Sequence, residues 1–116
     1  MDGMNLIAGR VTYVDFGGGR GREQRGIRPA VVLNSTDFTE VVHELAIVVP
    51  CTRRDRSWGN HVLLQGPTGL SEPTYAMTEQ LRSVSIDRIL RNLGSVDNEC
   101  LRLIGRWTRT WMQTAA

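Results

Sequence analysis

Two short runs of this sequence consist entirely of apolar residues, and they constrain the fold more than any other feature. They are AVVL at residues 30–33 and LAIVV at residues 45–49. Short apolar runs rich in β-branched residues are typical of strands that are covered on both faces. The stretch RVTYVDF at residues 10–16 is a further strand-like segment. The chain is therefore expected to form a sheet with the two apolar strands at its centre, the second ending at Pro50.

Further strand-like segments follow the apolar runs. Strands are expected at residues 61–64, 75–79 and 82–85, of which the last two are separate strands or one bent strand. A short helix is then expected at residues 88–93, because Asp87 is placed to act as its N-cap. The periodicity of the chain thus changes from strand to helix in its last third.

A longer helix is expected at the C-terminal end of the chain. Ser95 or Asp97 is placed to cap a helix that runs to about Gln113. Strands first and one long helix last are typical of a small β-barrel with a packed C-terminal helix. The sequence therefore predicts a mainly β (α+β) fold, and the chain length indicates a single domain over residues 1–116.

The composition is that of an ordinary globular protein, with 41% hydrophobic and 22% charged residues. No apolar run approaches the ~18–20 residues that span a bilayer, and residues 1–4 lack the basic start of a signal peptide. We therefore expect a cytoplasmic protein with no membrane partner. Cys51 and Cys100 match no metal-ligand spacing, so both are expected to be free thiols in the core.

The basic residues are all arginine, 14 in number, and seven of them form two clusters. The clusters contain Arg20, Arg22, Arg25 and Arg28 in the first and Arg53, Arg54 and Arg56 in the second. Guanidinium groups suit bidentate contacts to phosphate better than ammonium groups do. The clusters are therefore either solvated loops or contact sites for an anionic partner such as a nucleic acid.

The segment between the first two expected strands is the most unusual part of the chain. Residues 17–28 hold five glycines and four arginines, with Glu23 among them, so a long loop is expected there. Glycines let backbone N–H groups approach a phosphate, and a carboxylate can accept a proton or hold an arginine. A second candidate is Thr52, whose hydroxyl precedes two arginines.

These residue types suffice for cleavage of RNA, because RNA carries its own nucleophile, the 2′-hydroxyl. The protein must then supply positioned donors and one proton-transfer group. His43 and His61 are the only histidines, and neither stands at metal-ligand spacing from a cysteine or carboxylate. We therefore expect no metal and no other cofactor.

Three strings along the chain resemble MazF/PemK-type endoribonuclease toxins. They are GREQRGIRPAVVL at residues 21–33, AIVVPCT at residues 46–52 and AMTEQLRSV at residues 76–84. NHV at residues 60–62 resembles a further element of that family, and the whole match extends over roughly residues 9–105. The most specific part is the pattern E-Q-x-G-x-R-P within the first string.

The resemblance implies an SH3-like small β-barrel of the type found in MazF, CcdB and Kid. It implies metal-independent, sequence-specific cleavage of single-stranded RNA (mRNA, tRNA or rRNA), which leaves a 2′,3′-cyclic phosphate. Arg28 and Thr52 match the catalytic pair of the family. The resemblance also implies a homodimer and a cognate MazE-like antitoxin with an acidic, disordered tail.

Residues expected to contact RNA come partly from the resemblance and partly from their chemistry. The resemblance assigns Glu23, Gln24, Gln80 and Arg82 to the RNA groove, whereas charge suggests Arg25 and Arg53, and base stacking suggests Trp58. Each has a structural alternative: an arginine can be a surface residue, Thr52 a strand cap, and Glu23 an ion-pair partner. Trp107 and Trp111 have helical spacing and favour packing over base stacking.

Two other functions remain open from the sequence. One is a non-nuclease toxin of the same fold that acts by binding a protein, as the CcdB-type gyrase poisons do. The other is a catalytically inactive SH3-like module with an RNA-binding or regulatory role. Gyrase poisons of this type end in Trp-Gly-Ile, whereas this chain ends in WMQTAA at residues 111–116 and keeps Arg28 and Thr52. These differences favour the nuclease.

Overall fold

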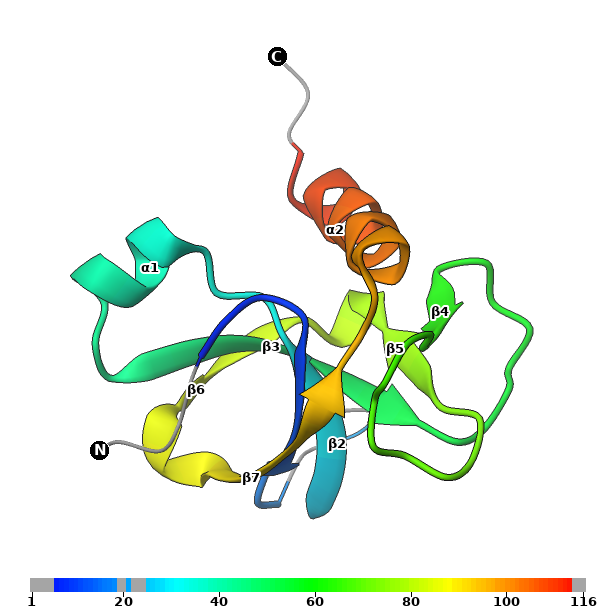
Figure 1. Ribbon diagram of the computed structural model, residues 1–116, viewed down its shortest axis with the longest axis horizontal. Helices are drawn as coiled ribbons and strands as arrows, with labels where there is room; N and C mark the ends of the chain where they lie inside the picture. The colour runs from blue at the N-terminus through cyan, green and yellow to red at the C-terminus, as the bar shows by residue number, and fades with distance from the viewer. Residues whose placement is uncertain (1–5, 19–20, 22–24, 114–116) are drawn as a thin grey trace.

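The computed structural model of the protein describes residues 6–18, 21 and 25–113. It contains one antiparallel β-sheet, a short helix and a long C-terminal helix (Figure 1). The elements in chain order are β1 (Arg10–Asp15), β2 (Ile27–Val32), α1 (Thr36–Val41), β3 (Leu45–Thr52), β4 (His61–Leu63), β5 (Tyr75–Met77), the 3-10 turn η1 (Thr78–Gln80), β6 (Arg82–Ser85), the 3-10 turn η2 (Ile86–Arg88), β7 (Ile89–Ser95) and α2 (Asn98–Met112).

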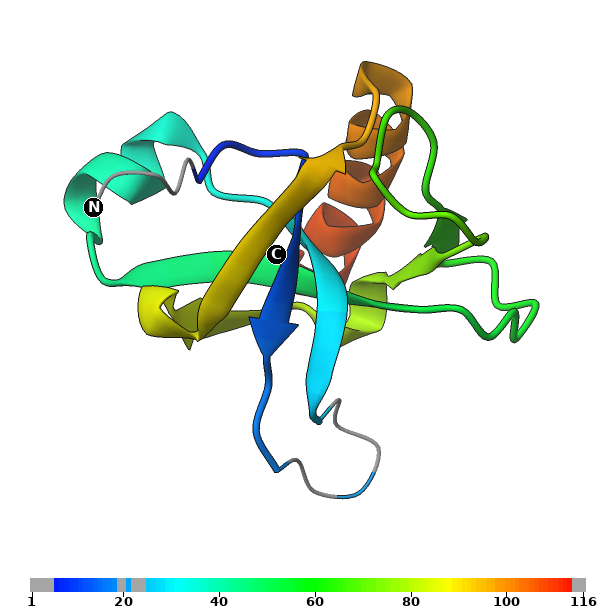
Figure 2. The ribbon, with the colours of Figure 1, turned by 60° about the horizontal axis from the view of Figure 1, so that its bottom comes forward.

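The strands pair in the order β4-β5-β3-β2-β1-β7, and β6 lies beside the first half of β3. Within the described residues this path is open, with β4 and β7 at its ends, rather than a closed ring. The expected mainly β fold with a C-terminal helix is confirmed. Figure 1 shows α1 and the β4–β5 hairpin at opposite ends of β3, and Figure 2 shows the β1–β2 hairpin extending away from the rest of the sheet.

The sheet is buried on both of its faces at the two central strands. Val31 and Val49 face a core that includes Cys100 and Ile104 of α2. Ala30, Val32 and Val48 face the second core, which is enclosed between β1, β2, β3, β6 and β7. Because successive side chains of a strand point to opposite faces, only fully apolar runs satisfy both cores. The prediction of two central strands from these runs is confirmed.

The C-terminal helix begins where its capping residue predicts. Asp97 Oδ1 accepts a hydrogen bond from the Cys100 N–H at 2.8 Å, which satisfies one of the unpaired donors of the first turn. Cys100, Ile104 and Thr108 are the buried residues of α2 and lie on one face of it. Leu101 and Trp107 pack against the same core from the side.

The predicted helix at residues 88–93 is wrong, because this segment is the strand β7. β7 pairs with β1, so that Arg91 lies opposite Tyr13 and Ile89 opposite Val14. Only the short turn η2 precedes it, capped by the Ser85 hydroxyl. The free edge of β1 provides the partner that turns the segment into a strand, which local propensity does not reveal.

Three further boundaries differ from the sequence-based expectation. Residues 36–41 form the helix α1, capped by the Ser35 hydroxyl, where only a turn was expected at residues 34–37. β2 begins at Ile27, so Arg28 lies in a strand rather than in the preceding loop. β3 continues through Pro50 to Thr52 instead of ending at the proline.

Pro50 is tolerated inside β3 because the two strands that pair with one edge of β3 leave a gap at this residue. On that edge β6 pairs with β3 as far as Val48, and β5 pairs with it from Cys51 onward. On the other edge Pro50 lies opposite Ala30 of β2. Neither β5 nor β6 pairs with β3 at Pro50, so the missing N–H of the proline costs no hydrogen bond on that edge.

The segment between β4 and β5, residues 64–74, is fixed on β7 by close backbone contacts. The Ser95 N–H donates to the Pro67 carbonyl at 3.0 Å, and the Asp97 N–H donates to the Gln65 carbonyl at 2.9 Å. Gly69 has φ +79°, and a Cβ there would lie 2.1 Å from the Leu93 carbonyl oxygen. Only glycine fits this position.

Gly69→Ala is therefore expected to lower the free energy of unfolding by about 2 kcal/mol or more, through backbone strain and the clash with β7. Urea denaturation followed by circular dichroism measures this change. Gly59→Ala is the matched control, since a Cβ at Gly59 has open space and the change should stay within about 0.5 kcal/mol. Equal stabilities of the two variants would contradict the proposed anchoring.

Candidate active site

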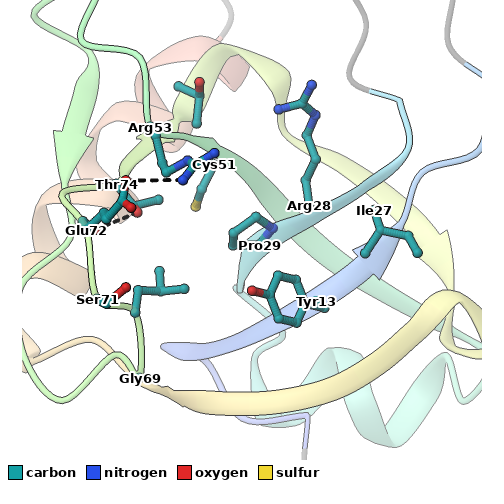
Figure 3. A pocket seen from close by; sticks show the side chains of 12 residues that line it. Tyr13, Ile27, Arg28, Pro29, Cys51, Arg53, Gly69, Ser71, Glu72 and Thr74 are labelled. Atoms are coloured by element: carbon teal, nitrogen blue, oxygen red, sulfur yellow. Dashed lines mark hydrogen bonds and ion pairs between the residues drawn. The ribbon is translucent and has the colours of Figure 1, made fainter.

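Arg28 and Thr52 lie on the same cleft, which opens between the ends of β2 and β3 and the 64–74 segment (Figure 3). The cleft has a volume of about 410 Å³, within the usual range for small-molecule sites. It is lined by Tyr13, Ile27, Arg28, Pro29, Cys51, Thr52, Arg53, Gly69, Leu70, Ser71, Glu72 and Thr74.

The register of β2 against β3 explains why Arg28 and Thr52 meet. Ala30 lies opposite Pro50, and Val32 opposite Val48. The same antiparallel register, continued two residues beyond the last pair, sets Arg28 opposite Thr52. Each is two positions from a paired residue, so both side chains leave the sheet on the same face.

Arg28 is exposed and held from its own hairpin. Its backbone pairs with Val14 of β1, and its Nε donates to the Arg25 carbonyl oxygen at 3.1 Å. Figure 3 shows its side chain pointing away from Tyr13 and Pro29, toward the open rim of the cleft. The terminal N–H groups of the guanidinium are thereby presented to the rim.

Thr52 ends β3 and begins a turn. Its Oγ1 accepts a hydrogen bond from the Arg54 N–H at 3.1 Å, so the hydroxyl proton can be donated to another group. The neighbouring Cys51 is fully buried, and burial raises the pKa of its thiol far above the ordinary value. Cys51 is therefore a neutral thiol at pH 7 and cannot serve as a nucleophile.

A charged pair occupies the other side of the cleft. Arg53 Nη1 donates to Glu72 Oε1 at 3.1 Å, and the two side chains are 71% and 60% exposed. The Thr74 hydroxyl donates to the Glu72 carbonyl at 2.9 Å, which fixes the backbone at Glu72. In Figure 3 Glu72 and Ser71 lie across the cleft from Tyr13, whose hydroxyl points into the opening.

A second polar cluster, which the sequence analysis missed, joins η1 to the β3–β4 loop and α2. We call it the Glu79 network; it consists of Asn60, His61, Thr78, Glu79 and Trp111. The Glu79 carboxylate accepts from Asn60 Nδ2 at 2.7 Å and lies 3.0 Å from His61 Nε2. The Thr78 hydroxyl donates to the Asn60 carbonyl and accepts from Trp111 Nε1 at 3.1 Å.

The Glu79 network favours the charged carboxylate. Burial acts to raise the pKa of Glu79, but hydrogen bonds from His61, Asn60 and its own backbone outweigh burial, so the pKa lies below its ordinary value of 4.5. The only hints in the sequence are the NHV and TEQ strings, because the partners stand 18 and 19 residues apart.

The remaining residues expected to bind RNA lie outside the cleft or outside the described residues. Arg82 begins β6 with its guanidinium 5.5 Å from the centre of the Phe16 ring, and Gln80 lies in η1. Trp58 is 45% exposed and contacts the His61 ring at a centroid distance of 4.9 Å. Arg25 is exposed near the cleft rim. Glu23 and Gln24 lie outside the residues that the structure describes.

The arrangement can bind and polarise a phosphate diester. An exposed guanidinium and a threonine hydroxyl present donors from one face, and a second guanidinium, that of Arg53, follows directly after the end of β3. Among the described residues, no three His, Cys, Asp or Glu side chains lie close enough together to hold a metal ion.

Comparison with known proteins establishes the family. Residues 8–111 match the family model described as "PemK-like, MazF-like toxin of type II toxin-antitoxin system". The chain belongs to this family. The resemblance noted from the sequence is thereby confirmed.

Two relatives with assigned names extend over most of the chain. Endoribonuclease MazF9 of Mycobacterium tuberculosis is 34% identical over 94 residues, which are 76% of this chain and 80% of the relative. Endoribonuclease toxin MazF of Escherichia coli is 32% identical over 97 residues, which are 83% of this chain and 84% of the relative.

Solved structures share the fold. MazF of Deinococcus radiodurans superposes with a TM-score of 0.78 at 24% identity, covering 90% of this chain and 94% of that one. Toxin MazF-mt6 of Mycobacterium tuberculosis superposes with a TM-score of 0.71 at 12% identity, covering 92% and 99%. None of the helices in the described part of the chain is long and apolar enough to cross a membrane.

The Glu79 network should make stability depend on pH. Because the folded-state pKa of Glu79 lies below 4.5, its charged form stabilises the fold above that pH, and this contribution is lost as the pH falls through the folded pKa. Glu79→Gln should therefore lose less free energy of unfolding than the wild type between pH 7 and pH 3. Urea denaturation at a series of pH values measures both slopes.

The exposed Glu44, which stands at the opposite end of β3, provides the control for this measurement. Glu44→Gln should keep the slope of the wild type. If Glu79→Gln also keeps that slope, the network does not stabilise the carboxylate in the way described.

Proposed function

We propose that the protein is a metal-independent endoribonuclease toxin that cleaves single-stranded RNA at short sequence motifs. The observation that carries the proposal is the shared cleft of Arg28 and Thr52, with both side chains on one face of the sheet. Membership of a toxin family, and relatives named as endoribonucleases at 32–34% identity, support it.

In the proposed reaction the 2′-hydroxyl of the substrate attacks the adjacent phosphorus. The bond from phosphorus to the 5′ oxygen breaks, which leaves a 2′,3′-cyclic phosphate and a 5′-hydroxyl. Arg28 donates hydrogen bonds to the phosphoryl oxygens and to the departing 5′ oxygen, where negative charge develops. Thr52 donates its hydroxyl proton as a hydrogen bond to a phosphoryl oxygen of the transition state.

A base accepts the 2′-hydroxyl proton, and Arg28, the predicted proton-transfer group, gives a proton to the leaving 5′ oxygen. The base then releases its proton and Arg28 takes one up from solvent, so no net proton is gained or lost. Glu23 is the acceptor that the sequence suggests, and it lies outside the described residues. The RNA strand on either side of the cut is assigned to acidic, cationic, aromatic and amide side chains that the sequence predicts to bind RNA. These are Glu23, Gln24, Arg25, Arg53, Trp58, Gln80 and Arg82.

The proposed assembly is a homodimer in the cytoplasm that binds a cognate MazE-like antitoxin. Support for an antitoxin comes from the description of the family as part of type II toxin–antitoxin systems. An acidic tail complements the arginines around the cleft, and it would block the cleft until it is removed. The alternative of a gyrase poison is not favoured, because the named relatives are endoribonucleases.

Arg28→Ala is expected to abolish cleavage, because the phosphate loses its forked donor, while the exposed position leaves the fold intact. The assay incubates a long RNA with the purified protein in EDTA and maps the new 5′-hydroxyl ends. A circular dichroism spectrum like that of the wild type is the control for folding. Full activity of this variant would exclude the proposed chemistry.

Thr52→Val keeps the β-branched shape of the side chain and removes only its hydroxyl. Turnover is expected to fall about 10²-fold or more, the usual scale for the loss of one transition-state donor. Single-turnover rates on a short RNA that contains the mapped motif measure this change. An unchanged rate would show that Thr52 only caps the end of its strand and takes no part in the reaction.

A further inference from the structure

The cleft extends beyond the Arg28–Thr52 rim into a pocket with apolar sides and a polar far end. Tyr13 and Pro29 form one side, and Leu70 lies on the other. The Arg91 guanidinium lies over one face of the Tyr13 ring, 5.8 Å from its centre. Aromatic and apolar sides with polar groups at the end are what a splayed nucleobase requires.

The polar end of this pocket is the Arg53–Glu72 pair. A single hydrogen bond joins the two side chains, whereas a guanidinium carries five N–H donors and a carboxylate has about four acceptor positions. Since both side chains are largely exposed, their mutual attraction is weak and yields to a better partner. The pocket therefore offers a strong acceptor and a strong donor side by side.

Only one RNA base matches this combination along its Watson–Crick edge. Guanine presents two adjacent donors, N1–H and the N2 amino group, next to the acceptor O6. Adenine and cytosine present one donor group beside acceptors, and uracil presents one donor between two acceptors. A carboxylate that accepts two hydrogen bonds, beside a guanidinium that donates to O6, thus selects guanine.

We infer that this pocket is a guanine subsite, in which Glu72 accepts from N1–H and N2–H and Arg53 donates to O6. The inference rests on the proposed endoribonuclease function and adds the base that must lie beside the cut. Glu72 is then the residue that determines specificity, while Arg28 and Thr52 act on the phosphate at the rim.

The position of Glu72 is rigid enough for such selection. Its carbonyl accepts from the Thr74 hydroxyl, and Thr74 is buried. The 64–74 segment that carries it is fixed on β7 at Gly69, where no side chain fits. The backbone that carries the carboxylate is thus held in place, and a base that leaves one of the Glu72 oxygens without a donor binds less well.

The test uses the full chain and begins with the sites that the wild type cuts in a long RNA. We expect guanine at one fixed position relative to the cut in all of them. Short RNAs with that motif are then made with guanosine or with inosine, which lacks the N2 amino group, at the fixed position. Inosine should lower the single-turnover rate of the wild type about tenfold or more.

Glu72→Gln should remove this discrimination, because an amide cannot accept from both N1–H and N2–H through one oxygen. This variant should cut guanosine and inosine substrates at nearly equal, reduced rates. Glu44→Gln, a carboxylate-to-amide change at an exposed site directly before the start of β3, should discriminate like the wild type.

Three results would overturn the inference while leaving the proposed function intact. They are cutting without a shared guanine, equal wild-type rates on guanosine and inosine, and undiminished discrimination by Glu72→Gln. A wild-type protein that cuts no RNA would instead contradict the proposed function itself, and the subsite with it.

Discussion

The pairing of β2 with β3 is the constraint on which the candidate site depends. Its last pair is Ala30 with Pro50, and the same register continued by two residues sets Arg28 opposite Thr52. Arg28 and Thr52 therefore stand at the open end of a rigid pair of strands, on the same face. Burial of valines on both faces fixes this register, since a slip of one residue would reverse every side chain.

Much of the fold could be predicted from local patterns. The apolar runs place β2 and β3 at the centre, and Asp97 marks the start of α2. The error at β7 arises because Asp87 and the residues after it satisfy the local rules for a helix. Pairing with β1 decides the outcome there, and that interaction joins residues about 75 positions apart in sequence, as Val14 and Ile89 show.

The candidate site likewise combines residues that local sequence strings reveal with residues that only the fold brings together. Arg28 and Thr52 could be proposed because they stand in recognisable strings, each beside an apolar strand. Glu72 stands in a loop without any pattern, and only the fold brings its carboxylate to 3.1 Å from Arg53. His61 and Glu79 likewise become partners only when β4 pairs with β5, which sets His61 opposite Met77. Sequence reasoning therefore suggested the proposed reacting groups better than the side chains proposed to position or select the substrate.

The burial of Cys51 has a practical consequence for following motion at this site. Its sulfur has no access to solvent and stays protonated, so alkylating reagents can reach it only when the end of β3 separates from its neighbours. The rate of covalent labelling at this position then measures how often that end of the strand opens. Cys51 is thus a natural probe of local opening, one residue away from Thr52, and no cysteine needs to be introduced for this purpose.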